Sequence, residues 1–182
     1  MIIMIGGVPY TGKTTLMQKV IAELGETEIG FSKNGFNCIW FNKGKGLIVG
    51  HYPKGELYGG TDKLRYGTIS EFDKYILKQQ KLYKHILIEG DRFFISRHLE
   101  WLFKTYKNNQ VKVYVLEANQ TELDKRHLER GDKQNKKWLL GRSTLITNLK
   151  ENPVLVDRLE LRKVNSKVAL TKVKNEILEI VK

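Results

Sequence analysis

The sequence predicts an α/β fold with three layers, α/β/α, in which helices cover both faces of a mostly parallel sheet. An apolar run at 2–5 enters a glycine-containing loop and restarts as a helix at 14–24. Short apolar runs and amphipathic segments then alternate along the chain, as is typical of parallel strands joined by helices. The chain has 182 residues, of which 41% are hydrophobic, which suits one domain with a substantial core. We therefore expect a single domain at 1–182.

The strand, loop and helix at the start carry the most specific motif. Residues 7–14 fit the pattern G-x-x-x-x-G-K-[ST] without a mismatch, which is typical of a phosphate-binding loop. Glycines at both ends let the backbone turn so that its N–H groups point inward and cradle phosphate oxygens. The alternative is a glycine-rich turn that matches by chance. The residues predicted to contact the nucleotide are Gly7, Tyr10, Thr11, Gly12, Lys13, Thr14 and Thr15.

Two residues of this loop have predicted chemical roles. Lys13 can reach the β- and γ-phosphates of ATP, and the hydroxyl of Thr14 can bind the magnesium ion that bridges them. The sequence therefore predicts ATP and Mg²⁺ as cofactors.

The segment 36–69 is expected to bind the acceptor. It begins with β-prone runs at 38–41 and 47–49, which predict a hairpin, and continues as a long loop of the kind that is often functional. Asp62 and Arg65 lie three residues apart and can share a face if a helical turn forms. We interpret Asp62 as a base or acceptor-orienting group and Arg65 as a phosphate clamp. The alternative is a turn followed by an ordinary helix cap.

The next elements are a helix from Ser70, a buried strand at 85–89 and an amphipathic helix at 93–107. Glu89, Asp91 and Arg92 stand at the end of that strand, where ligands bind in open α/β sheets. One carboxylate there, with Asp91 favoured, can hold magnesium while the other accepts a hydroxyl proton, and Arg92 can grip a phosphate. Alternatively, Glu89 caps the following helix and pairs with Arg92.

The segment 119–150 follows a strand at 111–116, is rich in charge and is predicted to form a helical lid. Arg126 and Arg130 lie one helical turn apart, and either can neutralise charge on the moving phosphoryl group, with Arg142 as a further candidate. The alternative is a solvated basic face. Trp138, Leu145 and Leu149 keep helical spacing, so Trp138 is interpreted as a core residue, although an aromatic beside lysines also suits base stacking. A strand at 159–164 and a helix at 170–181 complete the chain.

Composition limits the remaining function classes. The 32 Lys and Arg exceed the 20 Asp and Glu, so the net charge is +12 and favours a polyanionic partner such as nucleic acid over a merely solvated lysine surface. The apolar runs are too short to span a membrane, and no basic leader precedes the first strand. The single cysteine, Cys38, excludes an internal disulfide, is interpreted as a packed thiol and suits the cytoplasm. No metal-binding pattern of His or Cys is present.

In their order along the chain, these motifs resemble the P-loop kinases of the nucleoside monophosphate kinase and polynucleotide kinase group. The resemblance implies that Asp91 and Arg92 bind magnesium-linked water and an acceptor phosphate, as in thymidylate-kinase-like members. It implies that Asp62 and Arg65 orient and deprotonate a hydroxyl, as in polynucleotide-kinase-like members. Arg126 and Arg130 are similar to the lid arginines of both.

Three stretches, 59–64, 88–93 and 130–142, more narrowly resemble a family of bacteriophage P-loop kinases. Those kinases phosphorylate the hydroxymethyl group of 5-hydroxymethyluracil in DNA, which implies a DNA partner and a location in the host cytoplasm. The residues at 63–66 depart from the pattern of that family, which leaves the identity of the acceptor open. The alternatives are a nucleoside monophosphate kinase and a non-catalytic, nucleotide-gated DNA-binding protein.

Overall fold

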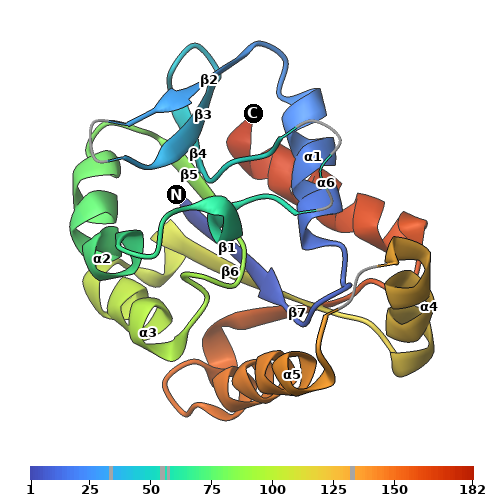
Figure 1. Cartoon of the computed structure of the whole chain (residues 1–182). Helices are drawn as coiled ribbons and strands as arrows, with labels where there is room; N and C mark the ends of the chain where they lie inside the picture. The colour runs from blue at the N-terminus through green and yellow to red at the C-terminus, as the bar shows by residue number, and fades with distance from the viewer. Residues whose placement is uncertain (33–34, 54–55, 57, 132–133) are drawn as a thin grey trace.

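The computed structural model describes residues 1–32, 35–53, 56, 58–131 and 134–182. Within this part of the chain, one seven-stranded sheet has helices on both faces (Figure 1). The strands are β1 (Ile2–Gly7), β2 (Thr27–Phe31), β3 (Asn37–Phe41), β4 (Gly46–Val49), β5 (His85–Glu89), β6 (Val111–Glu117) and β7 (Leu159–Lys163). The helices are α1 (Lys13–Glu23), α2 (Thr68–Gln79), α3 (Ser96–Thr105), α4 (Gln120–Arg130), α5 (Lys136–Glu151) and α6 (Lys167–Val181). Short 3₁₀ turns are η1 (Thr61–Lys63), η2 (Asn108–Gln110) and η3 (Val156–Arg158).

The sheet is parallel over most of its width. Its order is β2-β3-β4-β5-β1-β6-β7. Neighbouring strands from β4 to β7 in this order run parallel, whereas β3 runs antiparallel to both of its neighbours, β2 and β4. The central strand β1 is buried along its whole length, as expected of a parallel strand covered on both faces. Because β1 and β5 are parallel neighbours, the loops that follow them meet at the carboxyl edge of the sheet.

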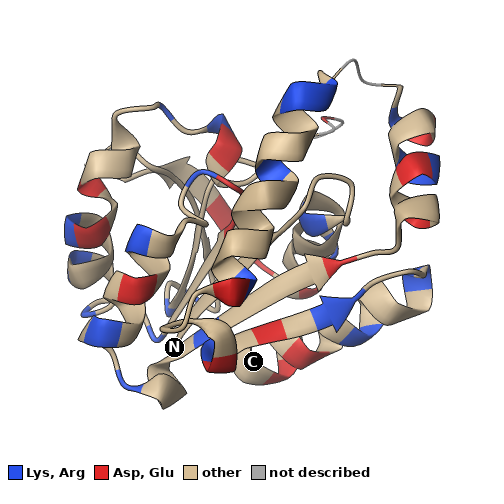
Figure 2. Ribbon diagram, turned by 90° about the horizontal axis from the view of Figure 1, so that it is seen from below, with Lys and Arg blue, Asp and Glu red and all other residues tan. Residues whose placement is uncertain are grey.

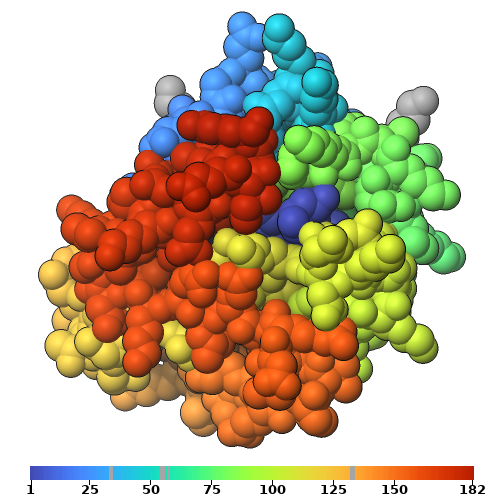
Figure 3. Space-filling view, turned by 180° about the vertical axis from the view of Figure 1, so that it is seen from behind, coloured from blue at the N-terminus to red at the C-terminus, as the bar shows by residue number. Residues whose placement is uncertain are grey.

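Two apolar layers hold the helices on the sheet. On one face α2, α3 and the second half of α5 pack on a core that contains Phe36, Phe72 and Phe93. On the other face α1 and α6 enclose Leu16 and Ile177. Figure 3 shows α6 in red across the back of the molecule, with the dark-blue start of β1 beside it. Complete burial of each large apolar side chain contributes roughly 1.5–3 kcal/mol. These layers therefore hold the strands and helices in place, and with them the ends of the loops that connect them.

The three-layer α/β prediction is confirmed, with differences in detail. The strand β2 was not predicted, because Ile29 and Phe31 are more than 70% exposed there and the strand lacks a buried face. The strands β3 and β4 belong to the central sheet, so the first half of the predicted acceptor-binding segment is part of the sheet. Helix α2 begins two residues before Ser70.

Two predictions about single side chains have opposite outcomes. The thiol of Cys38 is buried beside the hydroxyl of Tyr75, as expected of a packed cysteine. The prediction that Trp138 packs in the core together with Leu145 and Leu149 is wrong. Leu149 is buried, but Trp138 is 43% exposed, because only the second half of α5 reaches the sheet.

Charged side chains are spread over the surface. Figure 2 shows Lys and Arg along several helices, interspersed with Asp and Glu rather than gathered in one stripe. No helix among the described residues is long and apolar enough to cross a membrane.

Candidate active site

The loop after β1 is held open by its glycines. Gly7 has a φ of 142°, and a Cβ there would lie 2.3 Å from the carbonyl oxygen of Leu116. Gly12, with a φ of 89°, precedes α1 without a side-chain cap, so the first amides of the helix remain available to an anion. Inside the loop, the hydroxyl of Thr11 donates to the carbonyl oxygen of Val8 at 2.9 Å. The loop therefore has the local geometry of a phosphate-binding site.

Lys13 lies across this loop. Its Nζ donates to the carbonyl oxygens of Gly7, at 2.8 Å, and Val8, at 3.2 Å, and lies 3.4 Å from Oδ1 of Asp91. Because the side chain is nearly buried, its positive charge needs polar partners, and these oxygens provide them. The same ammonium group can donate its hydrogen bonds to phosphate oxygens instead when these enter the loop.

Glu89 ends β5 directly beside the loop. Its Oε1 accepts a long hydrogen bond from the hydroxyl of Thr14, at 3.4 Å, and its Oε2 accepts one from the hydroxyl of Tyr52, at 3.1 Å. Burial raises the pKa of Glu89 to about 8, against the opposing positive charge of Lys13. A carboxyl group with a pKa so far from its ordinary value, at the edge where ligands bind, is typical of a functional site.

Asp62 is brought to the same edge by η1. Its Oδ1 accepts hydrogen bonds from the backbone amides of Asp91 and Arg92, both at 3.0 Å, which fixes the carboxyl group at the pocket. Desolvation, and then the negative charge of Asp91, raises the pKa of Asp62 above its ordinary value.

Two glycines allow the loops that carry these carboxylates to approach each other. Gly60 has a φ of 73°, and a Cβ there would lie 2.3 Å from Oε2 of Glu89. Gly90 has a φ of 123°, and a Cβ there would lie 2.5 Å from Oγ1 of Thr61. Neither site accepts a larger residue without a shift of the backbone.

The arginines predicted to grip the acceptor occupy different places. Arg92 donates from Nη2 to the carbonyl oxygen of Asp62 at 2.9 Å and lies over the exposed ring of Tyr66 at 4.6 Å. Its Nε and Nη1 are buried without a hydrogen-bond partner among the described residues. Arg65 lies outside η1 and packs against Gly35, so the structure does not bring it beside Asp62 in one helical turn.

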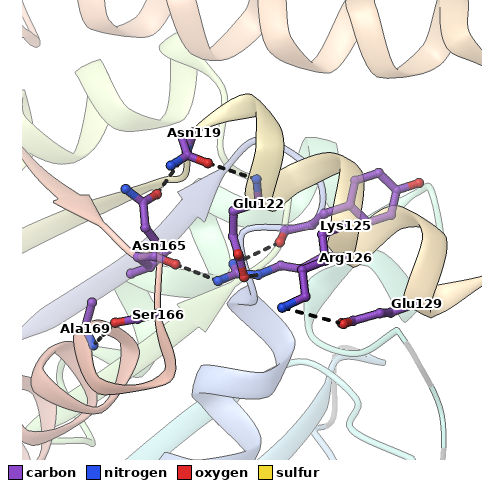
Figure 4. A network of polar contacts seen from close by, with 10 residues as sticks. Asn119, Glu122, Lys125, Arg126, Glu129, Asn165, Ser166 and Ala169 are labelled. Atoms are coloured by element: carbon purple, nitrogen blue, oxygen red, sulfur yellow. Dashed lines mark hydrogen bonds and ion pairs between the residues drawn. The ribbon is translucent and has the colours of Figure 1, made fainter.

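Helix α4, in the segment predicted to form a lid, presents two arginines of different character. Arg126 donates to Oε1 of Glu122 at 2.8 Å and to the carbonyl oxygens of Tyr10, at 3.2 Å, and Val164, at 2.7 Å (Figure 4). Its guanidinium is thus largely used in joining α4 to the loop. Arg130 lies over the ring of Tyr58 at 4.1 Å and faces the pocket.

A pocket of about 320 Å³ connects the phosphate loop with the lid. Of the predicted site residues, Gly7, Thr11, Arg65, Arg92 and Arg142 do not line it. Arg142 lies 5.9 Å from the ring centre of Trp138, and part of the motif at 130–142, Asp132 and Lys133, lies outside the described residues. The predicted residues that line the pocket are Tyr10, Gly12, Lys13, Thr14, Thr15, Asp62, Glu89, Asp91, Arg126 and Arg130.

Several side chains of the site were not predicted from the sequence. Tyr58, Glu129 and Gln134 line the pocket, and Tyr52 binds Glu89. The two tyrosines come from the long loop after β4, whose aromatic content was the available signal. Nothing in the local spacing distinguishes Glu129 or Gln134 from solvated residues.

The oxygen donors beside the loop fit magnesium. Thr14, Glu89 and Asp91 supply a hydroxyl and carboxylates, and Mg²⁺ is usually held by one or two protein oxygens together with substrate phosphates and water. Among the described residues, no group of three or more His, Cys, Asp or Glu could hold a metal ion by itself.

Comparison with solved structures shows a likeness of the fold. The structure is similar to a gluconokinase from Sinorhizobium meliloti 1021, with a TM-score of 0.51 and 12% identity over 98% of this chain and 90% of that chain. A shikimate kinase from Bacteroides thetaiotaomicron has a TM-score of 0.46 and 13% identity, over 98% and 96% of the two chains. The fold comparison therefore rests on the gluconokinase, and no curated protein sequence matches this chain. Because the model of the AAA domain family matches residues 3–152, most of its length, the chain belongs to that family.

Proposed function

We propose that this chain is an ATP-dependent kinase that transfers the γ-phosphoryl group of ATP to the hydroxymethyl group of 5-hydroxymethyluracil in DNA. The observation that carries the phosphotransfer is the position of Asp62. Its carboxyl group lines the same pocket as Lys13 and Thr14 and is fixed there by two backbone amides. A fixed carboxylate facing a phosphate loop suits the activation of an acceptor hydroxyl.

The reaction is an in-line displacement at the γ-phosphorus. The acceptor oxygen forms a bond to phosphorus as the bond to the β,γ-bridging oxygen breaks, and ADP leaves with that electron pair. Asp62 or Asp91 accepts the hydroxyl proton, and Lys13 holds the phosphate oxygens. Arg130, on the lid, neutralises charge on the moving group. Thr14 and a strand-end carboxylate would hold the magnesium ion, whose positive charge would offset the negative charge of the ATP phosphates.

Aromatic side chains around the pocket support a base as the acceptor. Tyr58 and Trp138 line it, and each has an arginine over its ring, Arg130 and Arg142 respectively. Flat side chains of this kind stack on an unpaired base. The net charge of +12 favours a polyanionic substrate, although Figure 2 shows no single basic stripe.

The test compares three acceptors in parallel reactions. ATP labelled at the γ-phosphate is incubated with Mg²⁺, the protein and one of three acceptors: DNA that contains 5-hydroxymethyluracil, the same DNA with thymine, or free deoxynucleoside monophosphates. We expect label only in the modified DNA. Label only in free diphosphates would reject the DNA substrate in favour of a nucleoside monophosphate kinase. No labelled acceptor at all, together with DNA affinity that depends on nucleotide and survives Asp62→Asn, would indicate a non-catalytic binding protein.

A further inference from the structure

Tyr10 has a backbone conformation that L side chains rarely adopt. Its φ is 66°, in the left-handed region where glycine is the least strained residue. The motif at 7–14 places no requirement on this position, so a glycine there would satisfy the pattern. A large aromatic side chain that is only 9% exposed nevertheless occupies it. A strained residue at a binding loop suggests that the side chain has a role there.

The contacts of Tyr10 reach the lid. Its ring stacks on that of His127, with the centres 4.6 Å apart and the planes at 25°. Its hydroxyl donates to Oε1 of Gln134 at 3.2 Å, and its carbonyl oxygen accepts from Nη1 of Arg126 at 3.2 Å. One residue of the phosphate loop therefore touches the middle of α4 and the segment between α4 and α5.

Helix α4 depends on such contacts because no apolar core holds it. None of its residues is buried. At its N-terminus, the amide of Asn119 donates to Oδ1 of Asn165 at 2.9 Å, and Arg126 reaches Val164, as Figure 4 shows. These bonds fix α4 as far as Arg126 to the loop before α6. An element with few buried contacts opens readily, so the position of its last turn is sensitive to Tyr10.

The second half of α4 carries the arginine that faces the pocket. The guanidinium carbon of Arg130 lies 5.7 Å from the centre of the Tyr10 ring and 4.1 Å from that of Tyr58. His127 lies about one helical turn before Arg130. The stack of Tyr10 on His127 therefore sets how far this end of α4 stands from the phosphate loop.

We propose that Tyr10 is a positioning residue that couples the phosphate loop to the lid and holds Arg130 over the transferring phosphate. The kinetic part of this inference rests on the proposed function. The structural part, that α4 is held on the loop through Tyr10, does not. A residue that positions the lid affects turnover more than nucleotide affinity.

The experiment compares three variants with the unchanged protein. Tyr10→Gly removes the side chain and relieves the backbone strain, and Tyr10→Phe keeps the ring but not the hydroxyl. Lys43→Gly is the matched control, since Lys43 also has a positive φ, 54°, but is exposed in the turn between β3 and β4. The readouts are kcat and KM for ATP with DNA that contains 5-hydroxymethyluracil, and amide hydrogen exchange of 120–130 with a non-hydrolysable ATP analogue and Mg²⁺.

For Tyr10→Gly we expect at least tenfold lower kcat, a KM for ATP within threefold of the original and at least tenfold faster exchange in α4. Tyr10→Phe should fall between Tyr10→Gly and the unchanged protein in both readouts, because the stack remains while the bond to Gln134 is lost, and Lys43→Gly should change neither readout. If Tyr10→Gly does not fold, Tyr10→Asn replaces it, because asparagine tolerates a positive φ, with the same expected values.

Two results would overturn the proposal. Unchanged exchange in α4 of Tyr10→Gly would mean that the lid is held without this residue. A rise in KM for ATP as large as the fall in kcat would make Tyr10 a simple nucleotide contact. If the unchanged protein phosphorylates no acceptor, the proposed function fails, whereas the exchange comparison still decides the coupling.

Discussion

The ammonium group of Lys13 lies 2.8 Å from the carbonyl oxygen of Gly7, the residue that begins its own loop. In this conformation the ammonium group binds carbonyl oxygens of its own loop and occupies the inside of that loop. A triphosphate must replace the two carbonyl oxygens and the Asp91 carboxylate around it. The position of the amine therefore matters for the bound phosphates and not for the packing of the sheet.

Lys13→Ala is expected to abolish phosphoryl transfer while the fold remains. Removal of one charge that stabilises the transferring group typically costs on the order of 100- to 1,000-fold in kcat, and the ammonium group contacts the loop carbonyl oxygens and Asp91. Turnover and thermal unfolding are measured on the same preparation. Retained turnover would contradict the role of the lysine, and a collapsed unfolding temperature would show that it is structural.

Asp62→Asn tests the acceptor-activating carboxylate. The amide oxygen of asparagine can still accept the bonds from Asp91 and Arg92, so the loop geometry should persist. We expect kcat to fall on the order of 100- to 10,000-fold, the range of general-base contributions, while KM for ATP changes little. Asp157→Asn, in η3 and outside the pocket, is the control and should keep the original kcat. An equal fall in both variants would remove Asp62 from the mechanism.

The parts of this site that could be predicted from the sequence are those fixed by local backbone rules. The spacing of 7–14 dictates the turn, and Glu89 follows from the end of a buried strand. Contacts between distant segments have no such signal. Asp62 meets the amides of Asp91 and Arg92 only because two glycines let the loops interlock, and neither spacing nor composition shows which loop lies against which.

The same reasoning explains the incorrect prediction for Trp138. Its helical spacing to Leu145 and Leu149 is correct, but a helix that projects beyond the sheet buries only part of its apolar stripe. Tertiary position therefore decides whether a residue on such a stripe joins the core or lines a pocket.

Gly60→Ala is expected to disturb the site by steric conflict. The new Cβ would lie 2.3 Å from a carboxylate oxygen of Glu89, at a φ of 73°. We expect a loss of stability of about 1–3 kcal/mol and a marked loss of kcat, because Glu89 or η1 must move. Gly44→Ala is the control, since Gly44 has a φ of 80° with no atom within 4 Å of a Cβ. It should carry the conformational cost alone and keep kcat, and equal kinetic losses would contradict the steric argument.

The stability of the fold is expected to depend on pH through His98. Burial of this ring lowers its pKa, against the opposing effect of Asp73, whose Oδ1 lies 2.8 Å from Nδ1, and Arg97 beside it lowers the pKa further. The unfolded chain, with a histidine pKa of about 6.5, therefore binds a proton that the folded chain does not. The contribution of His98 to the free energy of unfolding should fall as the pH drops from 7 to 5, whereas Glu89, whose pKa is raised to about 8, contributes in the opposite direction over this range.

Urea denaturation at pH 7, 6 and 5 measures this slope. His98→Gln should make the slope of the unfolding free energy against pH less positive, because the titrating ring is gone. Asp73→Asn should make that slope more positive, because the group that raises the pKa of His98 is removed. A slope that is the same in all three proteins would assign the pH dependence to other groups.

Arg130→Ala and Arg126→Ala are expected to have different kinetic effects, although the residues lie one turn apart on α4. Arg126 is bound to Glu122, Tyr10 and Val164, so its removal should loosen the lid, raise KM for ATP and lower kcat together. Arg130 faces the pocket over Tyr58, so its removal should lower kcat by roughly 1,000-fold or more, as for other transition-state arginines, with little change in KM.

Steady-state kinetics of both variants, with Lys125→Ala on the same helix as control, separates these effects. Equal losses of kcat and of ATP affinity in Arg130→Ala would make this arginine a ground-state grip, because a group that acts only on the transition state leaves substrate binding unchanged.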